Sequence, residues 1–320
     1  MAELGWVVAV LAGTGAIVWG AESFAEHLAP AAVALRVSTF ALALLLAGAE
    51  PEELATGVAA SLRHAPAVAL GDVVGANVAM CLVALGVGAV IAPLPFGQRV
   101  RRYALAGLPL GVVCAVVAWG GHVSRGVGAV LVGLYILYVA GIWILEGAPP
   151  ALGEAAELAE AKEEAAIRAR RHVGRDLGFI LLGVGAMSVG ATVLVEGVRH
   201  LSHADATQTQ LGLTLVGFAT AFELVALAWS ASRRGATEAV VAAVVGSYAY
   251  NATMTLGASA LARPLHVTHS SDLHVPLLAM IAALAAVLAL SWRRRTLDRS
   301  AGIILLACYP AFVIAVLVVP

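Results

Sequence analysis

Apolar stretches long enough to cross a bilayer follow one another along almost the whole chain. A membrane-spanning helix needs about 20 apolar residues, and ten segments meet this requirement, the second of them with a polar interruption. They lie near 5–26, 37–62, 66–92, 103–120, 126–146, 177–198, 209–231, 236–262, 274–292 and 300–319. Hydrophobic residues make up 61% of the chain and charged residues 12%, whereas soluble domains average about 45–50% and about 25%. We therefore expect an all-α, polytopic membrane protein with ten transmembrane helices.

Basic residues alternate between the connections that join these spans. The odd-numbered connections hold 15 of the 19 Lys and Arg residues, and the even-numbered ones hold 4. Because cytoplasmic loops are enriched in Lys and Arg, we expect a multi-pass protein of the cell membrane with both termini outside. Val7 to Ala21 is expected to belong to a retained first span, since no basic segment precedes it.

The longest polar stretch divides the chain into two halves of five spans each. Residues 147–176 carry acidic and basic side chains at a spacing that suits a solvated helix. We expect this stretch to be a cytoplasmic connecting loop between a first half at 1–146 and a second half at 177–320. A regulatory role for the loop is the alternative.

Three carboxylates and a proline interrupt the second apolar run. They stand in Gly48-Ala49-Glu50-Pro51-Glu52-Glu53-Leu54, and 37–46 and 54–62 on either side carry no charge. A charged side chain at the bilayer centre costs about 2.5–3.5 kcal/mol on insertion scales, and proline disfavours helix at the residue before it. Non-helical backbone at this depth is tolerated only where it is buried in protein or lines a cavity. The motif therefore indicates a cation site at a helix break; the alternative is a polar loop between two short soluble helices.

The second half repeats landmark residues of the first half at an offset of 170 or 171. The pairs are Glu53 with Glu223, Arg63 with Arg233, Gly75 with Gly246, and Gly86 with Gly257. Each feature lies five spans from its copy, and an odd number of spans inverts the second copy in the membrane. The pattern predicts two inverted five-helix repeats with the substrate site at their interface, near the bilayer midplane.

The repeated motifs resemble the alpha-repeats of the calcium/cation antiporter superfamily, which includes the sodium/calcium exchangers. The family pattern is Gly-Thr-Ser-Leu-Pro-Glu-Leu, then Gly-Asn-x-x-Gly-Ser-Asn-x-x-Asn about twenty residues on, then Leu-Gly. The first repeat offers Gly48 to Leu54 and Gly71 to Met80, and the second offers Phe218 to Leu224 and Gly246 to Asn251. By this resemblance the chain is identified as a divergent, prokaryotic-type member over nearly its whole length.

The resemblance implies which residues hold the transported cation. Glu53 and Glu223 match the paired glutamates that bind calcium in the family, and calcium takes six to eight oxygen ligands. The full set expected to hold the cation is Glu53, Glu223, Glu50, Thr220, Ser247, Asn251, Asn77 and Asp72.

Several positions depart from the family pattern in a way that bears on the counter-ion. Ala49, Ala219, Ala76 and Met80 stand where the family has a neutral oxygen donor, whereas Glu50 and Asp72 add carboxylates. Because the family's sodium sites use those neutral oxygens, sodium coupling is in question.

We expect Glu50 or Glu53 to carry a proton during part of the cycle, since crowded carboxylates favour a bound proton. Glu52 is expected to point elsewhere, because residues three apart share a helix face and Glu50 and Glu53 satisfy that spacing.

These features predict a secondary active antiporter that exchanges calcium or a similar divalent cation against sodium or protons by alternating access. A proton-coupled exchanger without sodium coupling and a cation-conducting pore are the alternatives.

The chain contains no nucleotide-binding motif, no His-Glu-x-x-His and no spaced cysteine set, so we expect neither an enzyme nor a bound cofactor. The net charge of −1 does not indicate binding to nucleic acid. The expected partners are the lipid bilayer and small inorganic cations, without an obligatory protein partner.

Overall fold

The computed structural model describes residues 2–34, 50–146, 173–201, 205–235 and 237–318. Within these ranges, nine helices are long and apolar enough to cross a membrane. They are Gly5–Phe24, Pro66–Ile91, Gln98–Ala118, Arg125–Glu146, Gly174–Leu201, Thr207–Arg233, Thr237–Ala262, Ser271–Ser291 and Arg299–Val318. The all-α, polytopic membrane architecture is thereby confirmed. The remaining predicted span, 37–62, is described only from residue 50 onward, and nearly all of the connecting loop predicted at 147–176 lies outside the described residues.

The helices follow one another with few other elements between them. The first half contains α1 (Ala2–Ala34), α3 (Pro51–Leu62), α4 (Pro66–Ala79), the π-helical turn η1 (Met80–Ala84), α5 (Leu85–Ile91), β1 (Leu94–Pro95), α6 (Gln98–Ala118), β2 (His122–Val123) and α7 (Arg125–Glu146). The second half contains α9 (Val173–Leu201), α10 (Asp205–Leu211), η2 (Gly212–Val216), α11 (Gly217–Thr220), α12 (Phe222–Arg234), α13 (Thr237–Tyr250), η3 (Asn251–Thr255), α14 (Leu256–Ala262), β3 (Leu265–His266), α15 (Ser271–Ser291), β4 (Thr296–Leu297) and α16 (Arg299–Val318).

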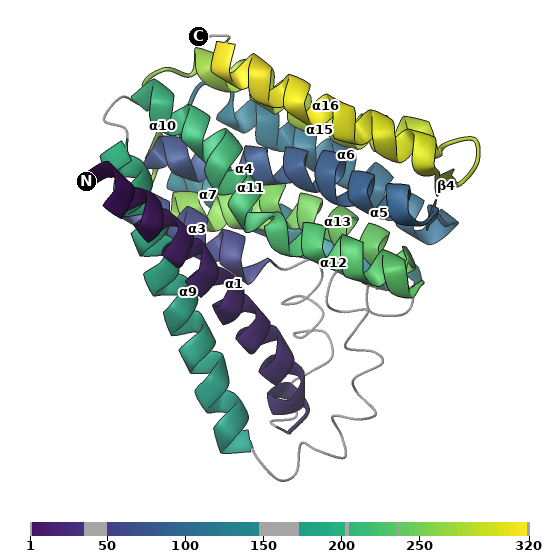
Figure 1. The fold of residues 1–320 in the computed structure, drawn as a ribbon, viewed down its shortest axis with the longest axis horizontal. Helices are drawn as coiled ribbons and strands as arrows, with labels where there is room; N and C mark the ends of the chain where they lie inside the picture. Colours follow the sequence, from purple (N-terminus) through teal and green to yellow (C-terminus); the bar gives the residue numbers. More distant parts are fainter. Residues whose placement is uncertain (1, 35–49, 147–172, 202–204, 236, 319–320) are drawn as a thin grey trace.

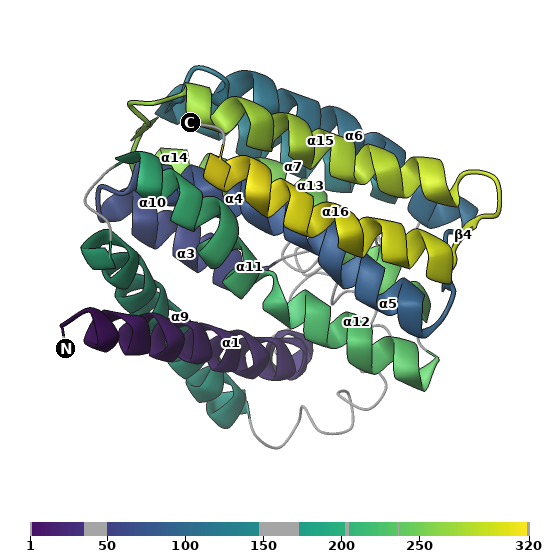
Figure 2. The same cartoon turned by 45° about the horizontal axis from the view of Figure 1, so that its top comes forward.

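Two helices, α1 and α9, lie side by side and at an angle to the rest of the bundle (Figures 1 and 2). Glycines allow this close packing: a Cβ on Gly13 would stand 2.7 Å from the carbonyl oxygen of Gly190, and one on Gly20 would stand 2.7 Å from that of Gly183. Small residues at such crossings let helix backbones approach each other in membranes. The α1–α9 pair is thus a packed unit of its own, and α3 is the element that contacts both of its helices most directly.

The centre of the molecule is formed by α4–η1–α5 and α13–η3–α14. In their most apolar windows 78% and 89% of the residues are buried, against 44% or less in the other seven candidate spans. Each of these two continuous helical segments, α4–η1–α5 and α13–η3–α14, is called a central rod. They carry the motifs Gly71 to Met80 and Gly246 to Asn251. The polar side chains of those motifs are therefore held inside protein rather than in contact with lipid.

Matching features recur in the two halves at the spacing that the sequence predicts. The π-helical turns η1 and η3 begin at Met80 and Asn251, which are separated by the same offset as Gly75 and Gly246. The short strands pair between the halves, β1 with β4 and β2 with β3, both antiparallel. Two inverted copies related by a pseudo-twofold axis would make contacts of this kind. The division of the chain into two domains at residue 146 itself stays a prediction.

Candidate cation site

The acidic motif of the first half lies at the buried start of α3. Glu50 precedes the helix with non-helical backbone angles, φ −113° and ψ 87°, and Pro51 opens the first turn. Proline fits this position because the first turn of a helix has no partner for its N–H groups. Glu52 and Glu53 follow within the first turn, where the helix dipole favours negative charge. The three carboxylates are 7%, 1% and 1% exposed, so their charge needs compensation from inside the protein.

The acidic segment of the second half is also placed at a helix interruption. The helix α11 ends at Thr220, Ala221 forms a turn, and α12 begins at Phe222. Glu223 stands in the first turn of α12, as Glu53 stands in the first turn of α3. Its carboxylate interacts electrostatically with those of Glu52 and Glu53. The structure thus brings Glu53 and Glu223, which come from opposite halves of the chain, into one cluster.

Two hydroxyl groups of the second half donate hydrogen bonds to carboxylates of the first half. Ser247 on α13 donates from Oγ to Oε1 of Glu50. Thr220 donates from Oγ1 to Oδ1 of Asp72 on α4, at 2.9 Å. All four side chains are buried. These bonds tie the acidic cluster to both central rods and fix one oxygen of each carboxylate.

Most of the other carboxylate oxygens in the cluster are left without a donor. Both oxygens of Glu52, both of Glu53 and Oδ2 of Asp72 accept no hydrogen bond within the described part of the chain. The ion pairs described join Arg99 to Glu146, Arg199 to Glu196 and Arg294 to Asp298. Glu50, Glu52, Glu53 and Asp72 therefore form no ion pair with a described residue. Buried charges without partners are strongly destabilising. The cluster is therefore a site where cations or protons are needed.

Glu50 and Glu52 form a carboxyl pair within this cluster. Glu50 and Glu52 lie close enough for their carboxyl groups to interact. Two neighbouring ionised carboxylates repel each other, so a proton on one of them or a cation between them would stabilise the pair. Tyr250 of α13 lies within electrostatic range of the same glutamates, and its ring packs edge-on against Tyr135 at 5.2 Å.

The two asparagines of the predicted set lie on the central rods but use part of their amide groups elsewhere. Asn77 donates from Nδ2 toward the carbonyl oxygen of Tyr248 and Sδ of Met280, both at 3.4 Å. Its Oδ1 has no donor among the described residues. Asn251 accepts a 3.0 Å hydrogen bond at Oδ1 from Thr255, which leaves this oxygen partly occupied. Asn77 thus has an acceptor oxygen to offer a cation, whereas Asn251 would have to share one.

The acidic side chains do not yet enclose a common point. Across residues 2–34, 50–146, 173–201, 205–235 and 237–318, no three His, Cys, Asp or Glu side chains converge closely enough to hold a metal ion. Carboxylates that lie near one another but do not converge can close around a cation by rotating their side chains. The arrangement shows a gathered set of oxygen donors rather than a finished coordination sphere.

The family model for the sodium/calcium exchanger protein matches residues 5–144 and 176–318. The chain belongs to the sodium/calcium exchanger family. An uncharacterized membrane protein of Methanocaldococcus jannaschii is 26% identical over 93% of this chain and 91% of its own length. The sodium/calcium exchanger MaX1 of Methanosarcina acetivorans is 24% identical over 95% and 96%. The solved sodium-calcium exchanger NCX_Mj, soaked with sodium and strontium, has the same fold with a TM-score of 0.63 at 21% identity, over 99% of both chains.

One expectation about the site of this exchanger-family protein was wrong. Glu52 was expected to point away from Glu50 and Glu53, by the rule that residues three apart share a helix face. The rule does not apply because Glu50 lies before the first turn and has non-helical backbone angles. Glu52 is 1% exposed and interacts with Glu50, Glu53 and Glu223. The sequence did contain a signal for a site role of Glu52, because Glu52 is an acid within an otherwise apolar run.

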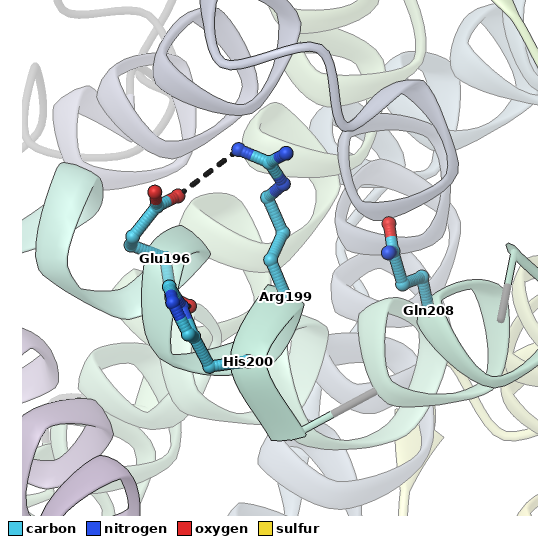
Figure 3. A pocket seen from close by; sticks show the side chains of 4 residues that line it. All are labelled: Glu196, Arg199, His200 and Gln208. Carbon is cyan, nitrogen blue, oxygen red and sulfur yellow. Dashed lines mark hydrogen bonds and ion pairs between the residues drawn. The ribbon is translucent and has the colours of Figure 1, made fainter. Parts of the chain in front are cut away.

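Another acidic residue, Glu196, lies apart from the acidic cluster. It stands near the end of α9 and forms a 3.1 Å ion pair with Arg199. Figure 3 shows both side chains beside His200, with Gln208 of α10 facing them across an open pocket of about 390 Å³. This pocket contains none of the residues of the acidic cluster. Glu22 of α1 is exposed and also lies outside the cluster.

Proposed function

We propose that this protein is a secondary active antiporter that exchanges calcium, or a similar divalent cation, for sodium or protons by alternating access. The observation that carries the proposal is the buried cluster of carboxylates from both halves, several of whose oxygens lack hydrogen-bond donors among the described residues. Calcium is a hard cation that takes six to eight oxygen ligands and favours carboxylates. A divalent ion in the cluster would supply the missing compensation for its charge.

In this proposal the side chains have distinct tasks. Glu53 and Glu223 bind the cation from opposite halves. Glu50 and Asp72 add oxygens whose orientation is set by the hydroxyl groups of Ser247 and Thr220. The free Oδ1 of Asn77 and the shared Oδ1 of Asn251 complete the set as neutral donors.

Alternating access requires one part of the bundle to move against the other around the site. The α1–α9 pair suits the moving part, because its two helices pack on each other through glycines and meet the remaining helices at few elements. Of the elements that carry the site, α3 contacts both helices of the pair and α11 contacts α1, so displacement of the pair would open the acidic cluster to one side or the other. This assignment places the cation at the boundary between a moving and a fixed unit, as transporters with inverted repeats do.

A second candidate, a proton-coupled exchanger without sodium coupling, is favoured by the Glu50–Glu52 carboxyl pair. Two neighbouring buried carboxyl groups can exchange a divalent ion for protons without any neutral ligand. Ala76, Met80 and Ala219, which carry no side-chain oxygen, stand at positions where the family places neutral donors.

Calcium flux into proteoliposomes tests the proposal. Purified protein is reconstituted, and calcium uptake is measured under an outward sodium gradient and, separately, under an outward proton gradient. We expect uptake with one of the two gradients and its loss in Glu223→Gln, while Glu196→Gln at the α9 ion pair keeps wild-type uptake. Equal uptake without either gradient, together with a calcium conductance that survives in Glu223→Gln, would establish a pore and overturn the antiporter assignment.

A further inference from the structure

Three arginines line a pocket at the end of the bundle where β1 pairs with β4. The pocket has a volume of about 300 Å³, and its lining comprises Phe96, Gln98, Arg101, Arg102, Leu105 and Arg295. Two segments far apart in the sequence form it, the start of α6 and the turn between α15 and β4. They are held together by strand pairing and by a 2.7 Å hydrogen bond from the Phe96 N–H to the carbonyl oxygen of Arg295. The arginines are therefore gathered by the backbone of the fold.

Among the described residues, no acid forms an ion pair with the arginines of this pocket. In the same region Arg99 pairs with Glu146 at 2.5 Å, and Arg294 pairs with Asp298 at 2.5 Å. Neither Arg101, Arg102 nor Arg295 forms an ion pair with any residue that the structure describes. Like charges gathered at one place repel one another, so an anion bound between them would stabilise the arrangement.

The geometry of Arg101 prepares it for an anion with several oxygens. Its guanidinium lies over the ring of Trp292, 3.5 Å from the ring centroid. A stacked guanidinium keeps its N–H groups available in its own plane, where they match the paired oxygens of a phosphate. The buried ring of Phe96 lines the pocket, and Gln98 adds a neutral hydrogen-bonding group.

The surroundings of the pocket suit a lipid. Trp292 is 49% exposed, and tryptophan is enriched at the level of the lipid headgroups. Leu105 stands at the edge of the pocket and is followed on α6 by Val112 and Val116, all exposed. Their spacing of seven and four residues places them on one helix face, a strip about 16 Å long at the helical rise. A molecule with a phosphate in the pocket could lay an acyl chain along this strip.

We propose that the pocket lined by Arg101, Arg102 and Arg295 binds the phosphate group of an anionic phospholipid, with the acyl chain along the Leu105–Val116 face of α6. Basic pockets between transmembrane helices are a known way to hold anionic headgroups. The site is separate from the acidic cluster and does not depend on which cation the protein transports.

Native mass spectrometry of the purified protein in detergent tests this proposal, with phosphatidylglycerol as the probe and phosphatidylcholine as the uncharged comparison. We expect the first phosphatidylglycerol to bind about tenfold more weakly to Arg101→Gln/Arg102→Gln, because charge-assisted hydrogen bonds to its phosphate are lost. The matched control is Arg293→Gln/Arg299→Gln, which removes the same charge from exposed arginines beside the pocket. This control should keep wild-type affinity.

Two further variants and a competing ligand complete the test. The single variant Arg102→Gln serves if the double variant does not fold, since Arg102 is exposed and makes no described contact with a partner. Arg295→Asn probes the third arginine, whose φ of 53° an asparagine tolerates well. Equal losses in the pocket and control variants, or equal binding of phosphatidylcholine, would overturn the proposal. Displacement of the lipid by inorganic phosphate at equal concentration would assign the pocket to the free ion instead.

Discussion

Thr220 at the end of α11 donates a 2.9 Å hydrogen bond to Asp72 on α4, and this bond joins residues 148 positions apart inside the acidic cluster. Thr220 matches Glu50 in the predicted repeat, since the two are separated by the same offset as Glu53 and Glu223. Glu50 accepts a hydrogen bond from Ser247 on the opposite rod. Each interrupted span thus forms one hydroxyl–carboxylate hydrogen bond with the central rod of the other half. Thr220 of the second half donates from its hydroxyl, whereas Glu50 of the first half accepts with its carboxylate. The two halves present different chemistry to the same site.

Replacing Thr220 with valine is expected to weaken calcium binding about tenfold, because a hydrogen bond to a charged group contributes about 1.5–3 kcal/mol. The change keeps the side-chain shape and removes the hydroxyl that donates to Asp72 and that also lies 3.2 Å from the carbonyl oxygen of Val216. The half-saturation concentration for calcium uptake in proteoliposomes measures it. Thr214→Val is the matched control, since Thr214 donates only to the backbone of Gln210, at 2.7 Å. Equal values in the two variants would show that Thr220 does not orient the carboxylate.

Glu52→Gln is expected to raise the half-saturation concentration for calcium by about an order of magnitude, which corresponds to roughly 1.4 kcal/mol. The physical reason is that Glu52 is buried beside Glu50 and adds negative charge to the cluster. Initial uptake rates over a range of calcium concentrations give the measurement. Glu238→Gln at the exposed start of α13 controls for loss of one acid. Unchanged calcium dependence in Glu52→Gln would remove Glu52 from the site.

Gly75→Ala is expected to destabilise the fold by about 1–3 kcal/mol, the usual cost of overpacking a well-packed core. A Cβ at Gly75 would stand 2.1 Å from the carbonyl oxygen of Leu213 in η2, so α4 and η2 would have to separate. Thermal unfolding of the detergent-solubilised protein reports the change. Gly133→Ala on α7 meets no atom within 4 Å and should unfold at or above the wild-type temperature. A Gly75→Ala variant as stable as wild type would contradict the close approach.

Asp298 is expected to make stability depend on pH below neutrality. The hydroxyl of Ser300, the N–H of Ala301 and the nearby Arg294 lower the pKa of Asp298. A carboxyl whose pKa is lower in the folded state stabilises above its unfolded pKa, and this stabilisation is lost as pH falls through the folded value. Melting temperatures of wild type and Asp298→Asn should therefore differ at pH 7 and converge in acid. A constant difference at all pH values would contradict this linkage.

Much of the architecture could be predicted from local sequence patterns. Nine of the ten predicted spans match candidate membrane helices, because apolar length is a property of each segment alone. The helix start at Pro51 was also readable, since proline constrains the backbone on both sides of itself. The constant offset between the halves is enough to predict that Glu53 and Glu223 occupy equivalent positions in the two repeats.

Other features depended on how distant helices cross. The surroundings of Glu52 depend on the non-helical backbone of Glu50 and on the approach of Glu223 from α12, neither of which a helix-face rule includes. The arginine pocket exists because β1 pairs with β4 and brings Arg295 next to Arg101, although the two arginines stand in opposite halves of the chain. Hydropathy and motif spacing act within a segment, so they set which helices form and which acids they carry. The partners of those side chains depend on contacts between segments, and only packing in three dimensions selects them.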